Sequence, residues 1–420
     1  MLMFLALVMP SSMTVPVTEI YTTPGCRYCS RAKGFLKKRG VEYIEKDVVD
    51  DASMLNDMIQ RAGRATLPQI FIAGEHIGGC SDMLDLHATG SLAARFEAAG
   101  ITLLDMVDDD PEPPPAAIVP EKQPGRDGGV LNAPIFGQQQ QQQQQGTTVA
   151  TKESGAAAAL SNAMQRQMLS LLDEYAKEDG GCDLARLRVS ADFAAFLDLA
   201  GQLCTLPAAE LLGSAAPLDE RKAFWINLYN CLVLHSTAVL GAPTDAAERG
   251  RYFSGASGAA YNVGGLTFCL DDIEHGVLRG NAPTVGGKVM FGENDDRLPF
   301  VLPQLDPRLH FALNCGARSC PPIKVYSTAR LEEGLNLATR AFLEGDLAPD
   351  VESNALTCTK LLDWYGPDFG ADERSRLLRL RDLLPDSKDL RRDLEALAEA
   401  ETSPSFIFRE YDWGSDVDPS

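Results

Sequence analysis

The fold of the first part of the chain is decided by residues 17–38, which read VTEIYTTPGCRYCSRAKGFLKK. The run Val17–Tyr21 is β-branched and aromatic, which is typical of a strand. A Thr-Thr-Pro-Gly turn follows this strand, and Cys26 then opens a helix that we predict to continue to Lys38. Cys29 lies one helical turn after Cys26, so the sequence predicts two thiols at a strand–helix junction.

The residues that follow continue to alternate between strand-like and helix-like patterns. We predict further strands at 41–45 and 69–73 and one that ends at Gly78-Gly79, and further helices at 51–62, 81–89 and 91–98. This β-α-β-α-β-β-α order resembles the α/β thioredoxin-like fold, in which flanking helices cover a central mixed four-stranded sheet.

Reactive thiol chemistry is expected at the start of the first helix. Unpaired backbone N–H groups and the helix dipole favour an anion there, so we expect the pKa of Cys26 to be lowered. The thiolate is the reactive form of cysteine. Cys29 is close enough to attack a mixed disulfide on Cys26. A lone C-x-x-C pair also allows two buried thiols or half of a zinc site, although no second pair with this spacing is present.

The first region resembles the glutaredoxin family over residues 15–101. The resemblance rests on the order of the elements and on two segments, EIYTTPGCRYC at 19–29 and TLPQIFIAGEHIGGCSD at 66–82. It implies that Cys26 is the catalytic nucleophile, that Cys29 is the resolving thiol and that Pro68 is the family's cis-proline. It also implies a set of residues that hold glutathione as co-substrate: Tyr28, Arg64, Leu67, Pro68, Gly79, Ser81 and Asp82.

One position departs from the family pattern, because Arg27 stands where a proline is common. A cation beside Cys26 would favour the thiolate further. The second cysteine is retained, which favours a dithiol enzyme over the carriage of an iron–sulfur cluster, although that alternative stays open. We expect Cys80 to be a small buried residue.

Composition and charge limit the classes of function. The chain has 420 residues and a net charge of −21, so nucleic acid is not expected as a partner. Ten cysteines are too few for a disulfide-stapled secreted scaffold of this length, which favours a reducing, cytoplasmic location. Residues 1–13 begin with the apolar run MLMFLALVMP, so plastid or secretory targeting by them stays open. The sequence contains no run of eighteen apolar residues, so we predict no membrane span.

Residues 102–155 are predicted to be a disordered linker between two domains. The stretch contains DDDPEPPPAA and eight consecutive glutamines at 138–145. Such a composition buries too little apolar surface to offset the entropy of the chain. Regular hydrophobic periodicity returns in 156–415, which we predict to be a C-terminal α+β domain.

The C-terminal domain resembles the domain-of-unknown-function 547 family, a family without an established reaction. The segments that carry this resemblance include FWINLYNCLVLH at 224–235, DPRLHFALNCGARSCPPI at 306–323, LLDWYGPDF at 361–369 and REYDW at 409–413. Within the first of these, Asn227, Asn230 and His235 interrupt a helix that is otherwise apolar on all sides, so we expect a buried polar network there.

The candidate chemical groups of the second domain are His275, His310, Cys315 and Cys320. A cysteine paired with a histidine that Asn230 or Asp272 orients would be typical of a thiol hydrolase. The same residues also allow simple packing, a Cys315–Cys320 disulfide reduced by the attached glutaredoxin, or a Cys/His zinc site. We predict no metal site.

The function expected from the sequence is a glutathione-dependent thiol–disulfide oxidoreductase. It would reduce protein disulfides or glutathionylated proteins through Cys26 and Cys29. The alternatives are a C-terminal cysteine-hydrolase-like enzyme or binding domain with the glutaredoxin as its redox regulator, and iron–sulfur cluster binding. The C-terminal domain is also a candidate for binding a protein partner.

Overall fold

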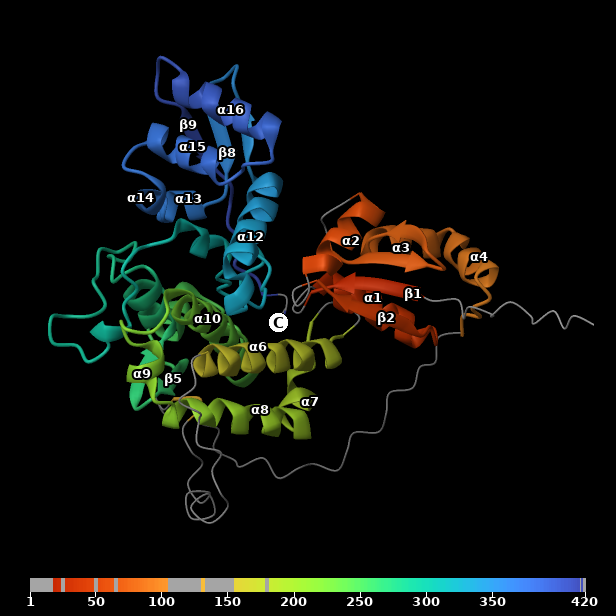
Figure 1. Ribbon diagram of the computed structural model, residues 1–420, viewed down its shortest axis with the longest axis horizontal. Coiled ribbons are helices and arrows are strands. Elements are labelled where there is room, and N and C mark those ends of the chain that lie inside the picture. Colours follow the sequence, from red (N-terminus) through yellow and green to blue (C-terminus); the bar gives the residue numbers. More distant parts are fainter. Residues whose placement is uncertain are drawn as a thin grey trace, which may run out of the picture. The chain divides into compact units, whose positions relative to one another are not determined.

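The structure is a computed structural model, and it describes residues 18–23, 27–48, 52–63, 67–104, 130–132, 155–177, 181–415 and 417. The chain divides into two compact units, with the boundary between residues 110 and 111. Figure 1 traces the elements of each unit. Cys26, Arg64 and most of the predicted linker lie outside the described residues.

The N-terminal unit is a mixed four-stranded sheet flanked by helices, as the sequence predicts. The strands have the order β2-β1-β3-β4, with β1 parallel to β2 and antiparallel to β3, and with β3 antiparallel to β4. The elements are β1 (Thr18–Thr22), α1 (Arg27–Lys38), β2 (Tyr43–Asp47), α2 (Ala52–Ala62), β3 (Gln69–Ile72), β4 (Glu75–Gly78), α3 (Cys80–Ala88) and α4 (Ser91–Ala98).

The core of this unit is built from one face of α1 and the central strands. Ile20 on β1, Ile70 on β3, Leu36 on α1 and Phe96 on α4 are fully buried together. Ala32 and Leu36 are four residues apart and lie on one face of α1, and this face packs against the sheet. As a result, α1 is fixed on the sheet, and its first turn carries Cys29.

The C-terminal unit begins with helices and two short strands. These elements are α6 (Ala156–Glu174), α7 (Leu184–Arg188), α8 (Ala191–Gly201), η1 (Gln202–Thr205), α9 (Ala208–Leu212), α10 (Leu218–Leu240), α11 (Ala246–Phe253), β5 (Ala260–Val263), β6 (Leu266–Cys269) and η2 (Asp272–Leu278). The hairpin β5–β6 turns at Gly264-Gly265, and both glycines have positive φ, as expected for this two-residue turn.

Short 3₁₀ turns and a small three-stranded sheet complete the unit. They are η3 (Leu298–Phe300), η4 (Pro307–Phe311), η5 (Thr328–Arg330), α12 (Leu331–Asp346), β7 (Ala348–Asp350), β8 (Ala355–Cys358), α13 (Leu361–Trp364), α14 (Gly366–Phe369), α15 (Glu373–Asp382), α16 (Lys388–Glu399) and β9 (Ser405–Phe408). The sheet order is β7-β8-β9, and leucines of α15 and α16 bury Leu356 of β8.

Helix α10 is the centre of this unit and packs along α6 (Figure 1). It is long and apolar enough to cross a membrane by length and composition, but 94% of its most apolar window is buried inside the fold. Asn227 exchanges two hydrogen bonds with the backbone of Tyr326, and Asn230 bonds the backbone of Ala312 and Asn314. The predicted buried polar groups are therefore bonded at Asn227 and Asn230, whereas His235 pairs separately with the Tyr261 hydroxyl at 2.8 Å. Asn230 fixes the loop that carries Cys315.

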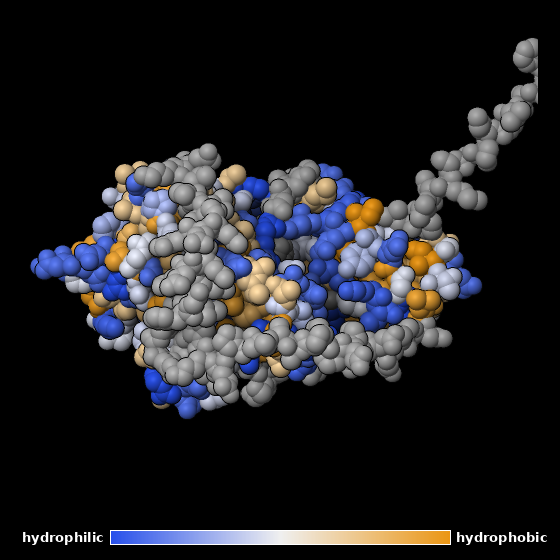
Figure 2. Space-filling view, turned by 90° about the horizontal axis from the view of Figure 1, so that it is seen from below, coloured by the Kyte–Doolittle hydropathy of each residue, from blue (hydrophilic) through white to orange (hydrophobic). Residues whose placement is uncertain are grey.

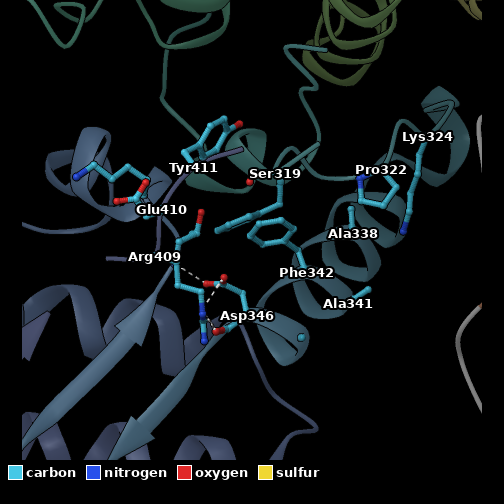
Figure 3. A pocket seen from close by; sticks show the side chains of 14 residues that line it. Ser319, Pro322, Lys324, Ala338, Ala341, Phe342, Asp346, Arg409, Glu410 and Tyr411 are labelled. Carbon is cyan, nitrogen blue, oxygen red and sulfur yellow. Dashed lines mark hydrogen bonds and ion pairs between the residues drawn. The ribbon is translucent and has the colours of Figure 1, made fainter. Parts of the chain in front are cut away.

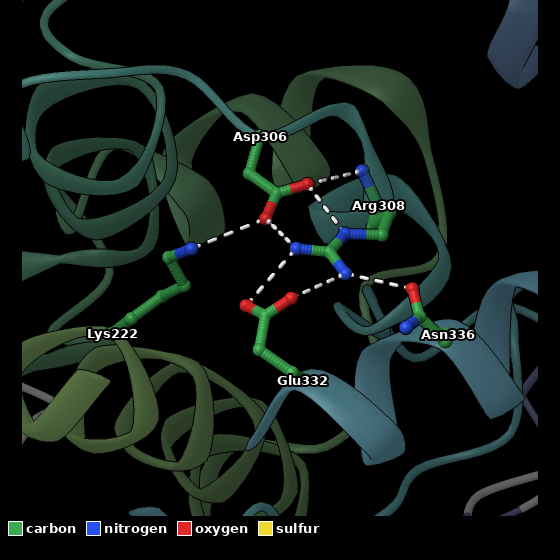
Figure 4. A network of polar contacts seen from close by, with 5 residues as sticks. All are labelled: Lys222, Asp306, Arg308, Glu332 and Asn336. Atoms are coloured by element: carbon green, nitrogen blue, oxygen red, sulfur yellow. Dashed lines mark hydrogen bonds and ion pairs between the residues drawn. The ribbon is translucent and has the colours of Figure 1, made fainter. Parts of the chain in front are cut away.

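A charged network joins α10 to η4 and α12 (Figure 4). Asp306 accepts from Lys222 at 3.1 Å and caps η4 by accepting from the backbone N–H of Arg308 at 3.1 Å. The Arg308 guanidinium bonds Asp306 and also Glu332 of α12. These bonds hold the start of the loop that leads to Cys315.

In the coloured parts of Figure 2, hydrophilic and apolar areas are interspersed. Exposed large apolar side chains are scattered in sequence, for example Ile44, Val285 and Ile407. Single exposed apolar residues of this kind are normal for a folded domain.

Three predictions need correction. The sequence of residues 271–279 predicts a capped helix, but the structure forms a π-helix there, η2, and Asp271 gives it no side-chain cap. The sequence of residues 406–413 predicts a strand, but β9 ends at Phe408, because the residues after it leave the sheet to contact the Cys315 loop. Residues 130–132 of the predicted linker are ordered, since Asn132 bonds the backbone of Ala200 and Asn262.

Candidate functional site

Cys29 lies in the first turn of α1 and is almost completely buried, with 2% of its surface exposed. Its sulfur takes part in a disulfide, whereas the other described cysteines are free thiols. A disulfide at the N-terminus of a helix is where a redox-active pair is expected, since the helix end favours the thiolate formed on reduction. Cys26, its predicted partner, lies outside the described residues.

The predicted glutathione-binding residues lie on three segments of the N-terminal unit. Tyr28 is 43% exposed on α1, one residue before Cys29. The Leu67–Pro68 peptide bond is cis, as the resemblance implies, and it immediately precedes β3. Gly79 and Asp82 lie at the start of α3, the helix that also contains Ser81.

The β4–α3 junction is tightly built. The carboxylate of Asp82 accepts from the backbone N–H of Gly79 at 2.8 Å and so caps α3. A Cβ on Gly79 would lie 3.2 Å from the Pro68 carbonyl oxygen, and one on Gly78 would collide with Asp82. Glycines therefore allow the proline segment and the α3 N-terminus to approach each other. A peptide that binds along this edge would meet backbone rather than side chains.

Two other residues of the N-terminal unit have defined surroundings. Lys33, on α1, forms an ion pair with Glu45 of β2 at 3.0 Å. Cys80 is 3% exposed, and burial raises the pKa of its thiol. Cys80 is therefore a small buried residue, as expected.

In the C-terminal unit, Cys315 and Cys320 lie at the two ends of one tight loop. Their sulfur atoms are 2.8 Å apart, and the backbone N–H of Cys315 donates to the sulfur of Cys320 at 3.1 Å. The Tyr411 hydroxyl lies 3.0 Å from the sulfur of Cys320 and 3.5 Å from that of Cys315. Both thiols are half-buried.

The two thiols of this loop differ in acidity. Hydrogen bonds from Cys320, from the Tyr411 hydroxyl and from the backbone of Ala317 lower the pKa of Cys315 to about 7, against the opposing effect of burial. Burial, reinforced by the neighbouring Cys315 sulfur, raises the pKa of Cys320 well above its ordinary value. Cys315 is thus the group that ionises near neutral pH.

A buried carboxylate lies near this thiol. Glu274 of η2 accepts from the Tyr229 hydroxyl at 2.9 Å and from the Tyr365 hydroxyl at 2.6 Å. Burial disfavours its charge, but His275 and these two hydroxyls hold its pKa below the usual range. The negative charge of Glu274 in turn opposes ionisation of Cys315.

The two predicted histidines pair with charged groups and not with a cysteine. His310 Nε2 lies 2.7 Å from Asp368, and its ring stacks on Tyr365 at 4.0 Å. Arg279 makes a two-point ion pair with Asp368 and lies 2.8 Å from His275 Nδ1. The structure thus brings both histidines into one buried charged network beside Glu274.

The residues proposed to orient a catalytic histidine have other roles. Asn230 fixes the backbone before Cys315, and Asp272 bonds the backbone and thiol of Cys269 and pairs with Arg297. Among the described residues, the hydrogen bonds of the Cys315 thiol go to Cys320, Tyr411 and the backbone. A Cys-His hydrolase arrangement is therefore not formed in this structure.

The structure adds residues to the C-terminal site that the sequence reasoning did not single out. Tyr411, Tyr365 and Asp368 come from the segments REYDW and LLDWYGPDF, which are far from Cys315 in sequence. The sequence signal for these residues was their place in segments that resemble the domain family. Spacing along the chain could not show that Tyr411 contacts the two cysteines or that Asp368 contacts His310.

A cavity of about 370 Å³ adjoins the thiol loop (Figure 3). Ser319 of the loop and Tyr411 line it, together with Phe342 and Ala338 of α12. Arg409 and Asp346 form an ion pair at 2.8 Å in its wall. Among the described residues, no group of three or more His, Cys, Asp or Glu side chains is placed to hold a metal ion.

The N-terminal fold and its helix-end disulfide define a thiol–disulfide oxidoreductase of the thioredoxin-like class. Residues 18–77 match the family model described as Glutaredoxin. Glutaredoxin 3 of Escherichia coli (strain K12) is 49% identical over 74 residues, which are 18% of this chain and 89% of that protein. The glutaredoxin of Pseudomonas aeruginosa is 38% identical over 84 residues, which are 20% of this chain and all of that protein. Through this domain the chain belongs to the glutaredoxin family.

Among solved structures, the solution structure of glutaredoxin from Brucella melitensis is 39% identical and has a TM-score of 0.19, covering 21% of this chain and 97% of that one. Residues 214–343 match a second family model, described as a protein of unknown function, DUF547. This match includes α10, η2 and the Cys315–Cys320 loop, but it supplies no reaction.

Proposed function

We propose that this protein uses glutathione as the reductant for disulfides in proteins and for glutathionylated proteins. The observation that carries the proposal is the buried disulfide sulfur of Cys29 in the first turn of α1. A resolving thiol in that position is shielded from solvent, and its partner at the helix N-terminus would be the exposed, ionised nucleophile.

The proposed reaction is thiol–disulfide exchange. The thiolate of Cys26 attacks one sulfur of the substrate disulfide, which forms a mixed disulfide and releases a thiolate. With a protein disulfide, Cys29 loses its proton and attacks Cys26, which releases the second substrate thiol and closes the Cys26–Cys29 disulfide. Two molecules of glutathione then reduce this disulfide and leave as glutathione disulfide.

The residues proposed to hold glutathione suit an extended peptide with charged ends. The backbone of Leu67 would pair with the peptide in a β-like manner. The N-terminus of α3, with Gly79 and Ser81, favours a carboxylate. Asp82 would receive the amino group of the γ-glutamyl end, Arg64 would receive the glycine carboxylate, and Tyr28 would cover the sulfur.

The free state of most described cysteines supports a reducing compartment as part of this proposal. The described cysteines other than Cys29 are free, and five of them are buried. Free thiols are characteristic of proteins that work in the cytoplasm.

The test is a glutathione-coupled reduction assay with wild type, Cys26→Ser and Cys29→Ser. Cys26→Ser should abolish turnover of both substrate types. Cys29→Ser should lose the reduction of protein disulfides but keep the removal of glutathione from proteins, because that reaction needs only one thiol. Cys80→Ser is the matched control and should keep both activities. Full activity of Cys26→Ser would refute the proposal.

A further inference from the structure

The loop of residues 315–320 holds the sulfur atoms of Cys315 and Cys320 in a geometry that allows them to form a disulfide. A disulfide bond is about 2.0 Å long, and the two free sulfurs are already 2.8 Å apart. Asn230 fixes the backbone on the near side of Cys315, and Asn314 bonds the carbonyl of Pro321 across the loop. The loop is therefore held in the conformation in which the sulfurs face each other.

The acidities of the two thiols suit a nucleophile and its resolving partner. Cys315 has a pKa of about 7 and Cys320 stays protonated. Burial raises the pKa of the other described free thiols, including Cys204, which is half-buried like Cys315. The low pKa is thus a property of this loop and not of exposure alone.

We propose that Cys315 and Cys320 form a second thiol–disulfide exchange site, which acts on low-molecular-mass disulfides that carry carboxylates. The site is separate from Cys26 and Cys29. Its oxidation does not depend on the function proposed above, but its return to the dithiol by the glutaredoxin domain does rest on that function.

The exchange balances as a two-electron step. The Cys315 thiolate attacks the substrate disulfide, which forms a mixed disulfide and expels one thiolate. Cys320 then transfers its proton to solvent and attacks the Cys315 sulfur, which expels the second thiolate and closes the Cys315–Cys320 disulfide. Both expelled thiolates take protons from water, so the dithiol is oxidised and one substrate disulfide is reduced to two thiols.

The adjoining cavity accounts for the class of substrate. Its volume of about 370 Å³ is in the range of small-molecule sites. Three cations line it: Arg409 pairs with Asp346, Lys360 pairs with Asp363, and Lys324 has no carboxylate partner among the described residues. Burial lowers the pKa of Lys324 to about 8. A carboxylate of the substrate would restore the charged form of Lys324.

The first test uses the full chain with Cys26→Ser and Cys29→Ser, so that only the second site can respond. The protein is equilibrated in buffers of glutathione and glutathione disulfide, quenched in acid, alkylated and digested. The mass of the peptide that contains residues 315–320 is then measured by mass spectrometry. We expect reversible loss of two hydrogens with one midpoint potential, while Cys204 stays alkylated throughout. If both thiols stay alkylated at every potential, or if Cys315 stops at the glutathione adduct, the proposal is wrong.

The second test separates the roles of the neighbouring residues. Tyr411→Phe removes a hydroxyl donor, so the pH midpoint for alkylation of Cys315 should rise from about 7. Lys324→Met should raise the concentration of glutathione disulfide needed for half-maximal oxidation several-fold. Lys360→Met is the matched control and should change it little, because Lys360 already has an acidic partner. Equal values for both lysine variants would exclude the assigned substrate class.

The reset step is measured by adding glutathione to the oxidised chain. With Cys26 and Cys29 present, reduction of the Cys315–Cys320 disulfide should be faster than in the Cys26→Ser chain. Equal rates would exclude reset by the glutaredoxin domain and leave the second site itself intact, so the two failures are distinguishable.

Discussion

Asp368 is the carboxylate that joins Arg279 and His310 in the buried charged network beside Glu274. Its side chain is 6% exposed, and its carboxylate receives both Arg279 and His310. Removing one partner from a buried ion pair leaves an uncompensated charge, which costs about 3–5 kcal/mol. Asp368 therefore links η2, η4 and α14 through a single side chain.

Asp368→Asn is expected to destabilise the C-terminal unit by about 3–5 kcal/mol in urea unfolding, because the Arg279 charge stays buried without its anion. Asp389→Asn is the matched control. Its side chain is 88% exposed and forms a surface ion pair with Arg392, so its effect should stay within about 0.5 kcal/mol. Equal effects of the two substitutions would contradict this account.

The same carboxylate predicts the response of the unit to acid. Burial by itself would raise the pKa of Asp368, but hydrogen bonds from His310 and Arg279 lower it to about 2. A carboxyl whose pKa is depressed in the folded state stabilises the fold above its unfolded pKa of about 3.9. That stability should be lost as the pH falls from about 4 through about 2. Unfolding of Asp368→Asn should show a smaller loss in this window.

At the scale of elements, the junction of β4 and α3 positions the predicted glutathione edge. Gly78 ends β4 with φ of 100°, and a Cβ there would lie 2.2 Å from the Asp82 carboxylate oxygen. That carboxylate caps α3 through Gly79. Strand, turn and helix N-terminus are therefore coupled through two glycines and one acid.

Gly78→Ala should lower the stability of the N-terminal unit by more than the roughly 1–2 kcal/mol of left-handed backbone strain, because it also displaces the Asp82 cap. Gly90→Ala is the matched control, since Gly90 has φ of 74° and open space around its Cβ position. Thermal unfolding followed by circular dichroism measures both. An equal loss in the two variants would show that the cap is not disturbed.

At the scale of the whole molecule, two folded units lie on either side of a stretch with a composition that cannot form a core. Within this stretch, Asn132 is 5% exposed and bonds the backbone of the C-terminal unit. A tether between two thiol sites raises the effective concentration of each for the other. The second exchange site would therefore have its reductant on the same chain.

Limited proteolysis should cut first within residues 105–129, because this stretch is rich in proline and acidic residues and poor in apolar ones. We expect two stable fragments, with residues 130–132 retained on the larger one and reductase activity on the smaller. Mass spectrometry of the fragments and the glutathione-coupled assay give the answer. A first cut inside either folded unit would contradict the prediction.

Much of the N-terminal unit could be predicted from the sequence, because its signals are local. The strand–turn–helix pattern around Cys29, the glycine turns and the alternation of short elements each specify backbone conformation within a few residues. The predicted strand at 41–45 begins two residues later in the structure, at Tyr43. Element ends depend on pairing with β1, which periodicity does not report.

The sequence alone thus determined the order of elements in the N-terminal unit, the position of Cys29 in the first turn of α1 and the burial of α10, since each follows from neighbours along the chain. Only the tertiary structure decided which thiols, acids and hydroxyls meet. Cys320 and Tyr411 are separated by 91 residues, yet the Cys320 sulfur lies 3.0 Å from the Tyr411 hydroxyl. His310 contacts Asp368 and His275 contacts Arg279, and neither histidine pairs with Cys315. Hydrogen bonds and ion pairs act over a few ångströms in space, and sequence spacing carries no information about such distances once the chain folds back on itself.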